Sequence, residues 1–192
     1  TLKTGAEVKI GARISGQVKN LLVKIGDFIR AGEIIAIIEH EDLLSRVARF
    51  KADLDAEKAR QLKILAEGPL EINKAVAERE ELLVQIKLAQ KMLERNQELN
   101  QKGFVSTTIL DEAEEKLEVL KARINLANEE LKLKQSQLQN DSRLARAMVD
   151  KAEANLNVEE IQLSYATITV PIDGIVAFVS TQEGETVVAS LN

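Results

Sequence analysis

The stretch LNQKGFVSTTILDEA, residues 99–113, interrupts a long run of helix-forming sequence with one glycine, two large apolar residues and three hydroxyl side chains. Gly103 suits the C-terminal end of a helix, where a left-handed residue is common. Three hydroxyl residues can each cap the start of the next helix: Ser106, Thr107 and Thr108. The sequence therefore predicts a turn at residues 102–107 between two helices.

Apolar residues recur in alternating steps of three and four on both sides of this turn, as in the seam of a coiled coil. After the turn the seam positions are Leu110, Ala113, Leu117, Leu120, Ile124, Ala127, Leu131, Lys134, Leu138, Asp141, Ala145, Met148 and Ala152. Before the turn they are Ile72, Ala75, Arg79, Leu82, Ile86, Ala89 and Leu93, with a weaker continuation towards Leu44 and Val47. The two arms have nearly equal lengths, which predicts an antiparallel helical hairpin over residues 41–164.

The first arm contains a helix-breaking pair, Gly68-Pro69. Proline lacks the backbone N–H that a helix needs, and it restricts the residue before it. We expect a kink or a short unwound turn at this place.

The two ends of the chain have a different composition, with short β-branched runs at residues 8–10, 17–23 and 34–38 and a similar pattern after residue 164. The two ends can be laid over one another, because a fixed offset matches Gly16 with Gly174, Gly26 with Gly184, Asp27 with Glu185, Val18 with Val176, Leu21 with Val179 and Ile29 with Val187. Neither copy has enough strands to be stable alone. We therefore expect residues 1–40 and 165–192 to form one β-sandwich, split by the hairpin, in an α+β fold.

Composition excludes several classes of function. A net charge of −5 argues against nucleic acid as a partner, since that needs a basic face. No cysteine is available as a nucleophile or thiolate ligand. The single histidine, His40, lies among Glu39, Glu41 and Asp42, which fit the start of a helix better than a metal site. With no catalytic motif visible, we predict no catalytic residue, metal or cofactor.

The turn leaves two apolar side chains, Phe104 and Val105, where a solvated tip is normally polar. The turn geometry requires neither of these side chains, and exposed apolar residues often mark a contact surface. This pair makes the tip a candidate binding site.

The whole chain resembles the HlyD-like periplasmic adaptor, or membrane fusion, proteins of tripartite efflux pumps and type I secretion systems. SGQVKNLLVKIGDFIRAGEIIAIIE, residues 15–39, is similar to the first half of their biotinyl/lipoyl-like domain, and LSYATITVPIDGIVAFVSTQEGETV, residues 163–187, to the second. In the second half Ala166 and Val170 stand where the family pattern has Thr and Ala. Residues 5–27 and 163–171 resemble adaptors of the macrolide-exporter type.

The tip adds a further match, because adaptors that dock on TolC-like channels carry Arg, three residues, Leu, six residues and Ser across it. Arg95, Leu99 and Ser106 have this spacing. The resemblance thus implies that these three residues dock on the channel, and Phe104 with Val105 would give apolar support.

The resemblance implies a periplasmic adaptor that links an inner-membrane transporter to a TolC-like outer-membrane channel. The transporter is expected to be an ABC transporter, with RND or MFS pumps as alternatives, and the adaptor to form a homo-oligomer, a hexamer. It is expected in the periplasm of a Gram-negative bacterium, anchored to the inner membrane. The β-barrel, membrane-proximal and anchor regions are expected to lie outside this chain.

Two functions of other classes are alternatives. A structural coiled-coil scaffold would explain the seam, but neither the split β-domain nor the apolar tip. A lipoyl or biotin carrier needs a lysine on the tight turn after AIIE, residues 36–39, and HEDLL stands there instead. The two seam arms, each roughly 85–90 Å long as helices, favour a part that reaches a partner over either alternative.

Overall fold

The structure is a computed structural model that describes residues 7–189. Its elements are β1 (Gly16–Leu21), β2 (Phe28–Ile29), β3 (Ile34–Ile38), α1 (Glu41–Gln101), α2 (Thr107–Ser164), β4 (Thr167–Thr169), β5 (Gly174–Ile175) and β6 (Thr186–Val187). The predicted α+β class is confirmed. The stretches 1–6 and 190–192 of the two predicted half-domains lie outside the described residues.

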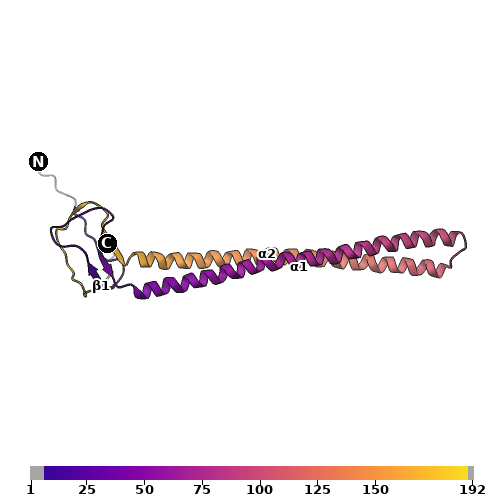
Figure 1. Ribbon diagram of the computed structural model, residues 1–192, viewed down its shortest axis with the longest axis horizontal. Helices are drawn as coiled ribbons and strands as arrows, with labels where there is room; N and C mark the ends of the chain where they lie inside the picture. The colour runs from indigo at the N-terminus through magenta and orange to yellow at the C-terminus, as the bar shows by residue number, and fades with distance from the viewer. Residues whose placement is uncertain (1–6, 190–192) are drawn as a thin grey trace. The chain divides into compact units, whose positions relative to one another are not determined.

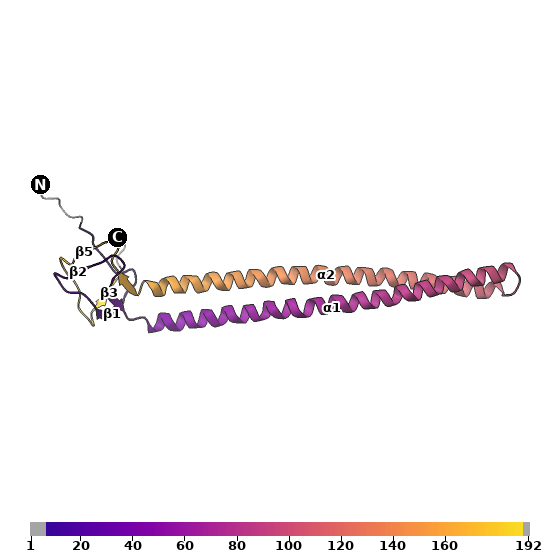
Figure 2. The ribbon, with the colours of Figure 1, turned by 45° about the horizontal axis from the view of Figure 1, so that its top comes forward.

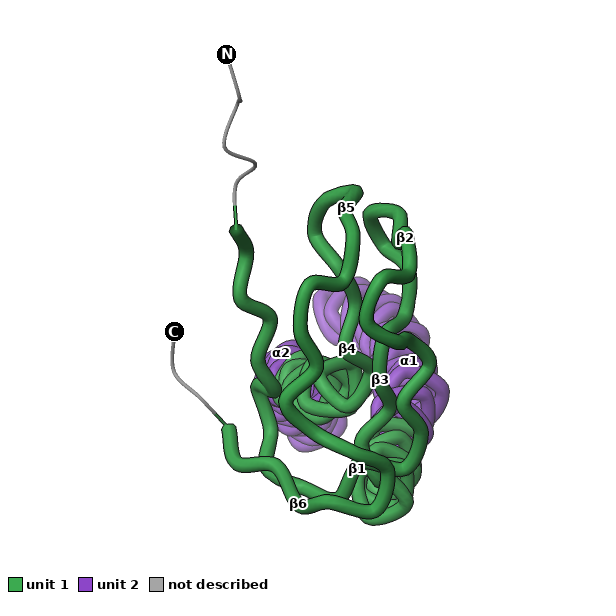
Figure 3. The backbone as a smooth tube through the Cα atoms, turned by 90° about the vertical axis from the view of Figure 1, so that its left-hand side faces the viewer, with its two compact units in different colours: residues 1–56, 150–192 green, residues 57–149 purple. Residues whose placement is uncertain are grey.

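Two compact units divide the chain (Figure 3). One unit contains residues 1–56 and 150–192, with all the strands, and the other contains residues 57–149, with most of both helices.

The strands of the first unit form two sheets. Four strands are paired in the order β4-β3-β1-β6, and β2 pairs with β5 in a separate two-stranded sheet. A buried cluster contains Val23, Ile29 and Val170, with Leu21, Ile35 and Val176 packed against it. Because β1 and β3 belong to one sheet and β2 to the other, this core is shared by the two sheets.

The two halves of the β-unit are related as the sequence repeat predicts. Gly16 pairs with Val187 in the β1–β6 ladder, and Gly174 pairs with Ile29 in the β5–β2 ladder. The repeat matches Gly16 with Gly174 and Val187 with Ile29, so the two ladders are the same pairing made twice. Each half therefore supplies the partner strand of the other.

The turns of the two halves repeat the same reciprocal bonding. The N–H of Gly26 donates to Val176 O at 2.8 Å, and the N–H of Val176 donates to Asp27 O at 2.9 Å. In the other half, Gly184 N–H donates to Val18 O at 2.8 Å and Val18 N–H to Glu185 O at 2.9 Å. The carboxylates of Asp27 and Glu185 each accept a bond from the N–H three residues earlier. The repeat is thus preserved down to single hydrogen bonds.

One predicted strand is wrong. Residues 8–10 are not in a strand, and Val8 and Ile10 are 46% and 38% exposed. Among residues 7–189 no strand pairs with this segment, and a β-branched run without a ladder partner does not form a strand. The predictions for 17–23 and 34–38 are confirmed by β1 and β3.

The junction before α1 confirms the helix-start interpretation of His40. Its Nδ1 lies 2.9 Å from the carbonyl oxygen of Ile38, and Glu41 and Asp42 fall in the first turn of α1. The pKa of Glu39 is lowered, chiefly because its carboxylate accepts a bond from the backbone N–H of His40, and secondarily by Lys19.

In residues 57–149, α1 and α2 run side by side in opposite directions (Figures 1 and 2). Lys134 Nζ lies 3.1 Å from Glu71 Oε2, and Arg79 Nε donates to Asn128 Oδ1 at 2.7 Å. The seam is packed towards the tip by a cluster of apolar residues: Leu82, Ile86, Ala89, Leu93, Leu117 and Leu120. The predicted antiparallel hairpin is confirmed.

Several predicted seam positions are wrong. Leu44 and Met148 are 48% and 42% exposed, and Asp141 also faces solvent. After Leu138 the more buried positions are instead Ser142, Ala145, Val149 and Ala152. The alternating pattern places the position after Leu138 three residues later, at Asp141. In the structure the next more buried position is four residues later, at Ser142.

Of the two alternatives expected at Gly68-Pro69, the unwound turn is wrong, because α1 is continuous from Glu41 to Gln101 with Pro69 inside it, and the kink stays a prediction. A neighbouring helix supports this stretch. A Cβ on Gly68 would overlap Leu138 Cδ1 of α2, so Leu138 sits directly over the glycine. The packing of α2 on α1 outweighs the local breaking tendency of the pair.

We predict that Gly26→Ala and Gly184→Ala destabilise the β-unit equally, by about 1–2 kcal/mol each, because both glycines have positive φ values of 95° and 84°. The fluorescence of Tyr165, the only tyrosine in a chain without tryptophan, reports urea unfolding of this unit. Gly174→Ala is the control, since Gly174 does not have a positive φ and a Cβ there has nothing within 4 Å. A loss at one turn only would contradict the equivalence of the halves.

Candidate docking site at the hairpin tip

The tip consists of residues 102–106, between the end of α1 at Gln101 and the start of α2 at Thr107. Gly103 has a φ of 73°, and its N–H donates to Asn100 O at 2.9 Å. The N–H of Phe104 donates to Leu99 O at 2.9 Å. These two bonds are those of a Schellman motif, which confirms Gly103 as the C-terminal glycine of α1.

A side-chain hydrogen bond from Asn100 also stabilises the turn. Asn100 Nδ2 donates to the carbonyl oxygen of Val105 at 3.0 Å, and Asn100 is half-buried. The sequence analysis missed this residue. An asparagine in the last turn before a glycine was the available signal, because its amide can bond to nearby backbone groups.

The three residues of the docking spacing have different surroundings. Arg95 and Leu99 are four residues apart in α1 and so share one face of its end. Arg95 is exposed, whereas Leu99 is half-buried. Ser106 is exposed and immediately precedes Thr107, at the N-cap position of α2. Leu99 therefore takes part in the turn through its carbonyl oxygen, Ser106 occupies the N-cap position, and Arg95 makes no contact of this kind.

The two apolar residues of the tip differ in exposure. Phe104 is 74% exposed, but Val105 is half-buried, which corrects the expectation that both are uncovered. The bond from Asn100 to the carbonyl of Val105 holds that residue against the turn. Ile109, in the first turn of α2, is 43% exposed and adds apolar surface that the sequence analysis did not name.

The side chain of Arg95 has unused hydrogen-bonding capacity near the tip. Within residues 7–189 it takes part in no ion pair and no side-chain hydrogen bond. Its guanidinium can donate two parallel bonds to a carboxylate or to carbonyl oxygens. The tip and the end of α1 thus offer two exposed cations, Arg95 and Lys102, and one exposed aromatic ring on a turn fixed by three hydrogen bonds.

Residues 7–189 hold no group of three or more His, Cys, Asp or Glu side chains arranged for a metal ion. Neither α1 nor α2 has a stretch apolar enough to span a bilayer.

The family of the chain follows from comparison with known proteins. A family model described as "RND MFP, barrel-sandwich hybrid domain" matches residues 6–191. The chain belongs to this family. The match includes both β-halves and the hairpin, so the predicted resemblance to membrane fusion proteins is confirmed.

Two curated relatives are export proteins. The macrolide export protein MacA of Yersinia pestis is 28% identical over 184 residues, which are 96% of this chain and 40% of MacA. The multidrug export protein EmrA of Haemophilus influenzae is 26% identical over 183 residues, which are 95% of this chain and 46% of EmrA. The chain therefore spans less than half the length of these relatives.

A crystal structure of a candidate efflux transporter from Bacteroides eggerthii has the same fold. It superposes with a TM-score of 0.51 and 17% identity, over 95% of this chain and 36% of that one.

We predict that Asn100→Ala loosens the tip without unfolding the hairpin. The carbonyl of Val105 loses its partner, and one hydrogen bond contributes about 0.5–1.5 kcal/mol. Amide hydrogen exchange at residues 102–106 should become about two- to tenfold faster. Gln97→Ala, at an exposed position of the same helix turn, is the control. Unchanged exchange in Asn100→Ala would show that the backbone bonds alone hold the turn.

Proposed function

We propose that the chain is the hairpin-bearing part of a periplasmic adaptor, which links an inner-membrane transporter to a TolC-like outer-membrane channel in an efflux or secretion pump. Membership of the membrane fusion protein family supports this function, as do the export roles named for MacA and EmrA. The adaptor does not catalyse a reaction, and its fold supplies positions for partners.

The exposure of Phe104 on a rigid turn is the observation that favours docking by the tip. Exposed aromatic rings anchor many protein interfaces when they enter a pocket of the partner. Arg95 supplies the polar complement, because guanidinium groups bond well to carboxylates and carbonyls. Helices of 61 and 58 residues are each about 90 Å long, which suits a part that reaches a distant partner.

The other parts of the proposal concern the assembly. The inner-membrane partner is an ABC transporter, with an RND or MFS pump as the alternative, and the adaptor acts as a homo-oligomer, a hexamer. It works in the periplasm of a Gram-negative bacterium, tethered to the inner membrane. The similarity to MacA, a macrolide export protein, supports an ABC transporter as the partner. The family model is described as 'RND MFP', which supports an RND pump instead.

The decisive variants are Arg95→Asp and Phe104→Asp in the complete adaptor, with drug export by intact cells as the measurement. Both side chains are exposed, so export should fall by an order of magnitude or more while the helical signal and the melting temperature stay unchanged. Leu99→Asp is less suitable, because Leu99 is half-buried and accepts a bond of the turn.

Matched controls lie further along α2. Arg123→Asp makes the same charge reversal at an exposed position, and Leu126→Asp replaces an apolar residue that is 72% exposed, close to the 74% of Phe104. Both controls should keep full export. If the tip variants also keep it, docking by the tip is wrong, and a scaffold role becomes the better description.

A further inference from the structure

The middle of the hairpin differs from its two ends in packing. In α1 the nearest buried side chains on either side of this stretch are Leu54 and Ala75, and none of residues 55–74 is buried. In α2 they are Leu120 and Ala145, and none of residues 121–144 is buried. The two stretches overlap in the hairpin at the level where Lys134 pairs with Glu71.

The seam changes step at the same level in both helices. In α1 the more buried positions Ile64, Gly68 and Ile72 are separated by two successive steps of four. In α2 the same two steps separate Lys134, Leu138 and Ser142. An extra four-residue step locally unwinds a coiled coil, and here both partners unwind together.

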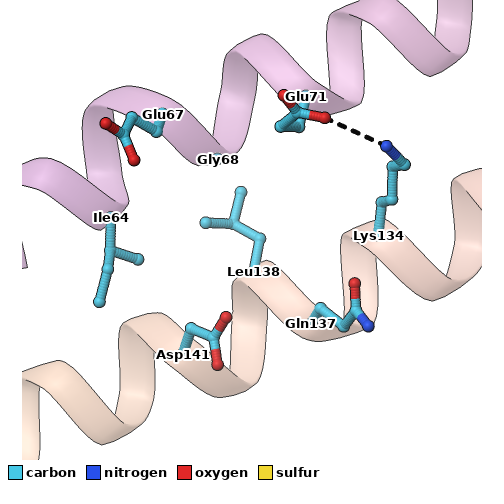
Figure 4. A pocket seen from close by; sticks show the side chains of 8 residues that line it. All are labelled: Ile64, Glu67, Gly68, Glu71, Lys134, Gln137, Leu138 and Asp141. Atoms are coloured by element: carbon cyan, nitrogen blue, oxygen red, sulfur yellow. Dashed lines mark hydrogen bonds and ion pairs between the residues drawn. The ribbon is translucent and has the colours of Figure 1, made fainter.

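The side chains at this level fill the seam poorly. Only three of the six seam positions are large apolar residues, since the others are Gly68, Lys134 and Ser142. Figure 4 shows Leu138 directed at the bare backbone of Gly68, where an added Cβ would overlap it. An open pocket of about 280 Å³ lies around this contact, lined by Ile64, Glu67, Gly68, Glu71, Lys134, Gln137, Leu138 and Asp141.

The backbone of α1 is weakened at the same point. Pro69 has no N–H, so the carbonyl of Leu65 loses the bond that the fourth following residue normally donates. Proline and glycine are common sites of helix bending, and an inserted step disturbs a coiled coil, and all three occur here within residues 64–72.

We propose that residues 64–72 of α1 and 134–142 of α2 form a packing joint, at which the hairpin opens and bends independently of its better-packed ends. Segments with few buried apolar contacts open with a lower free energy than the surrounding structure. The contact of Leu138 with Gly68 is the main apolar contact that closes the joint. The joint lets the tip segment change direction while the seam near Leu117 and Leu120 stays intact.

Amide hydrogen exchange of the whole chain tests the joint. Residues 64–72 and 134–142 should exchange at least about tenfold faster than residues 82–93 and 117–120. Leu138→Ala should accelerate exchange in both arms of the joint, and Leu133→Ala, which removes the same side chain at a position 57% exposed, should not. Uniform exchange along the hairpin would overturn the proposal.

The variant Pro69→Ala distinguishes a joint formed by both helices from a weakness of α1 alone. This variant restores the missing N–H donor in α1, so a joint predicts slower exchange at residues 134–142 of α2 as well. Slowing confined to α1 would overturn the proposal, because the weakness would then belong to one helix alone. Leu70→Ala, at the neighbouring position that is 66% exposed, is the control.

Spin labels give an independent measurement of opening. The chain has no cysteine, so pairs introduced at Ala66 with Asn140 and at Val84 with Ala122 carry the only labels. All four positions are exposed. The pair at the joint should show a broader distribution of interhelical distances than the pair in the tip segment, and equal widths would contradict the proposal.

Discussion

The whole β-unit depends on a reciprocal exchange of strands between two halves that are far apart in the sequence. Gly16 pairs with Val187 and Gly174 with Ile29, so each two-stranded contact needs one strand from each half. Neither ladder can form until the chain has gone out through α1 and returned through α2. The antiparallel hairpin is therefore a condition for folding of the β-unit, and loop closure over this distance makes the pairing entropically costly.

Much of this arrangement could be predicted from the sequence because it rests on local or repeated patterns. The offset that matches Gly26 with Gly184 predicted two equivalent turns, and their hydrogen bonds are equivalent. The turn at Gly103 followed from glycine and cap chemistry. Residues 8–10 show the limit of such patterns, since a β-branched run indicates a strand but says nothing about a partner.

The errors in the helices have another cause. A strict alternation of three and four placed Asp141 and Met148 in the seam, although both face solvent. The actual change of step depends on Leu138 meeting Gly68 across the hairpin, which no single helix encodes. At the tip, likewise, the sequence indicated an apolar pair, but it gave no sign that Val105 is half-buried and that only Phe104 stays exposed.

The antiparallel pairing of α1 with α2 also constrains how the length of such a protein can change. Glu71 meets Lys134 and Arg79 meets Asn128, so these contacts set the register of one helix against the other. An insertion in one arm would shift the register of the interhelical contacts on one side of the insertion. The register would be kept only if the other arm gained the same number of residues. Arms of this kind are therefore expected to lengthen or shorten in evolution by paired, simultaneous changes of whole heptads.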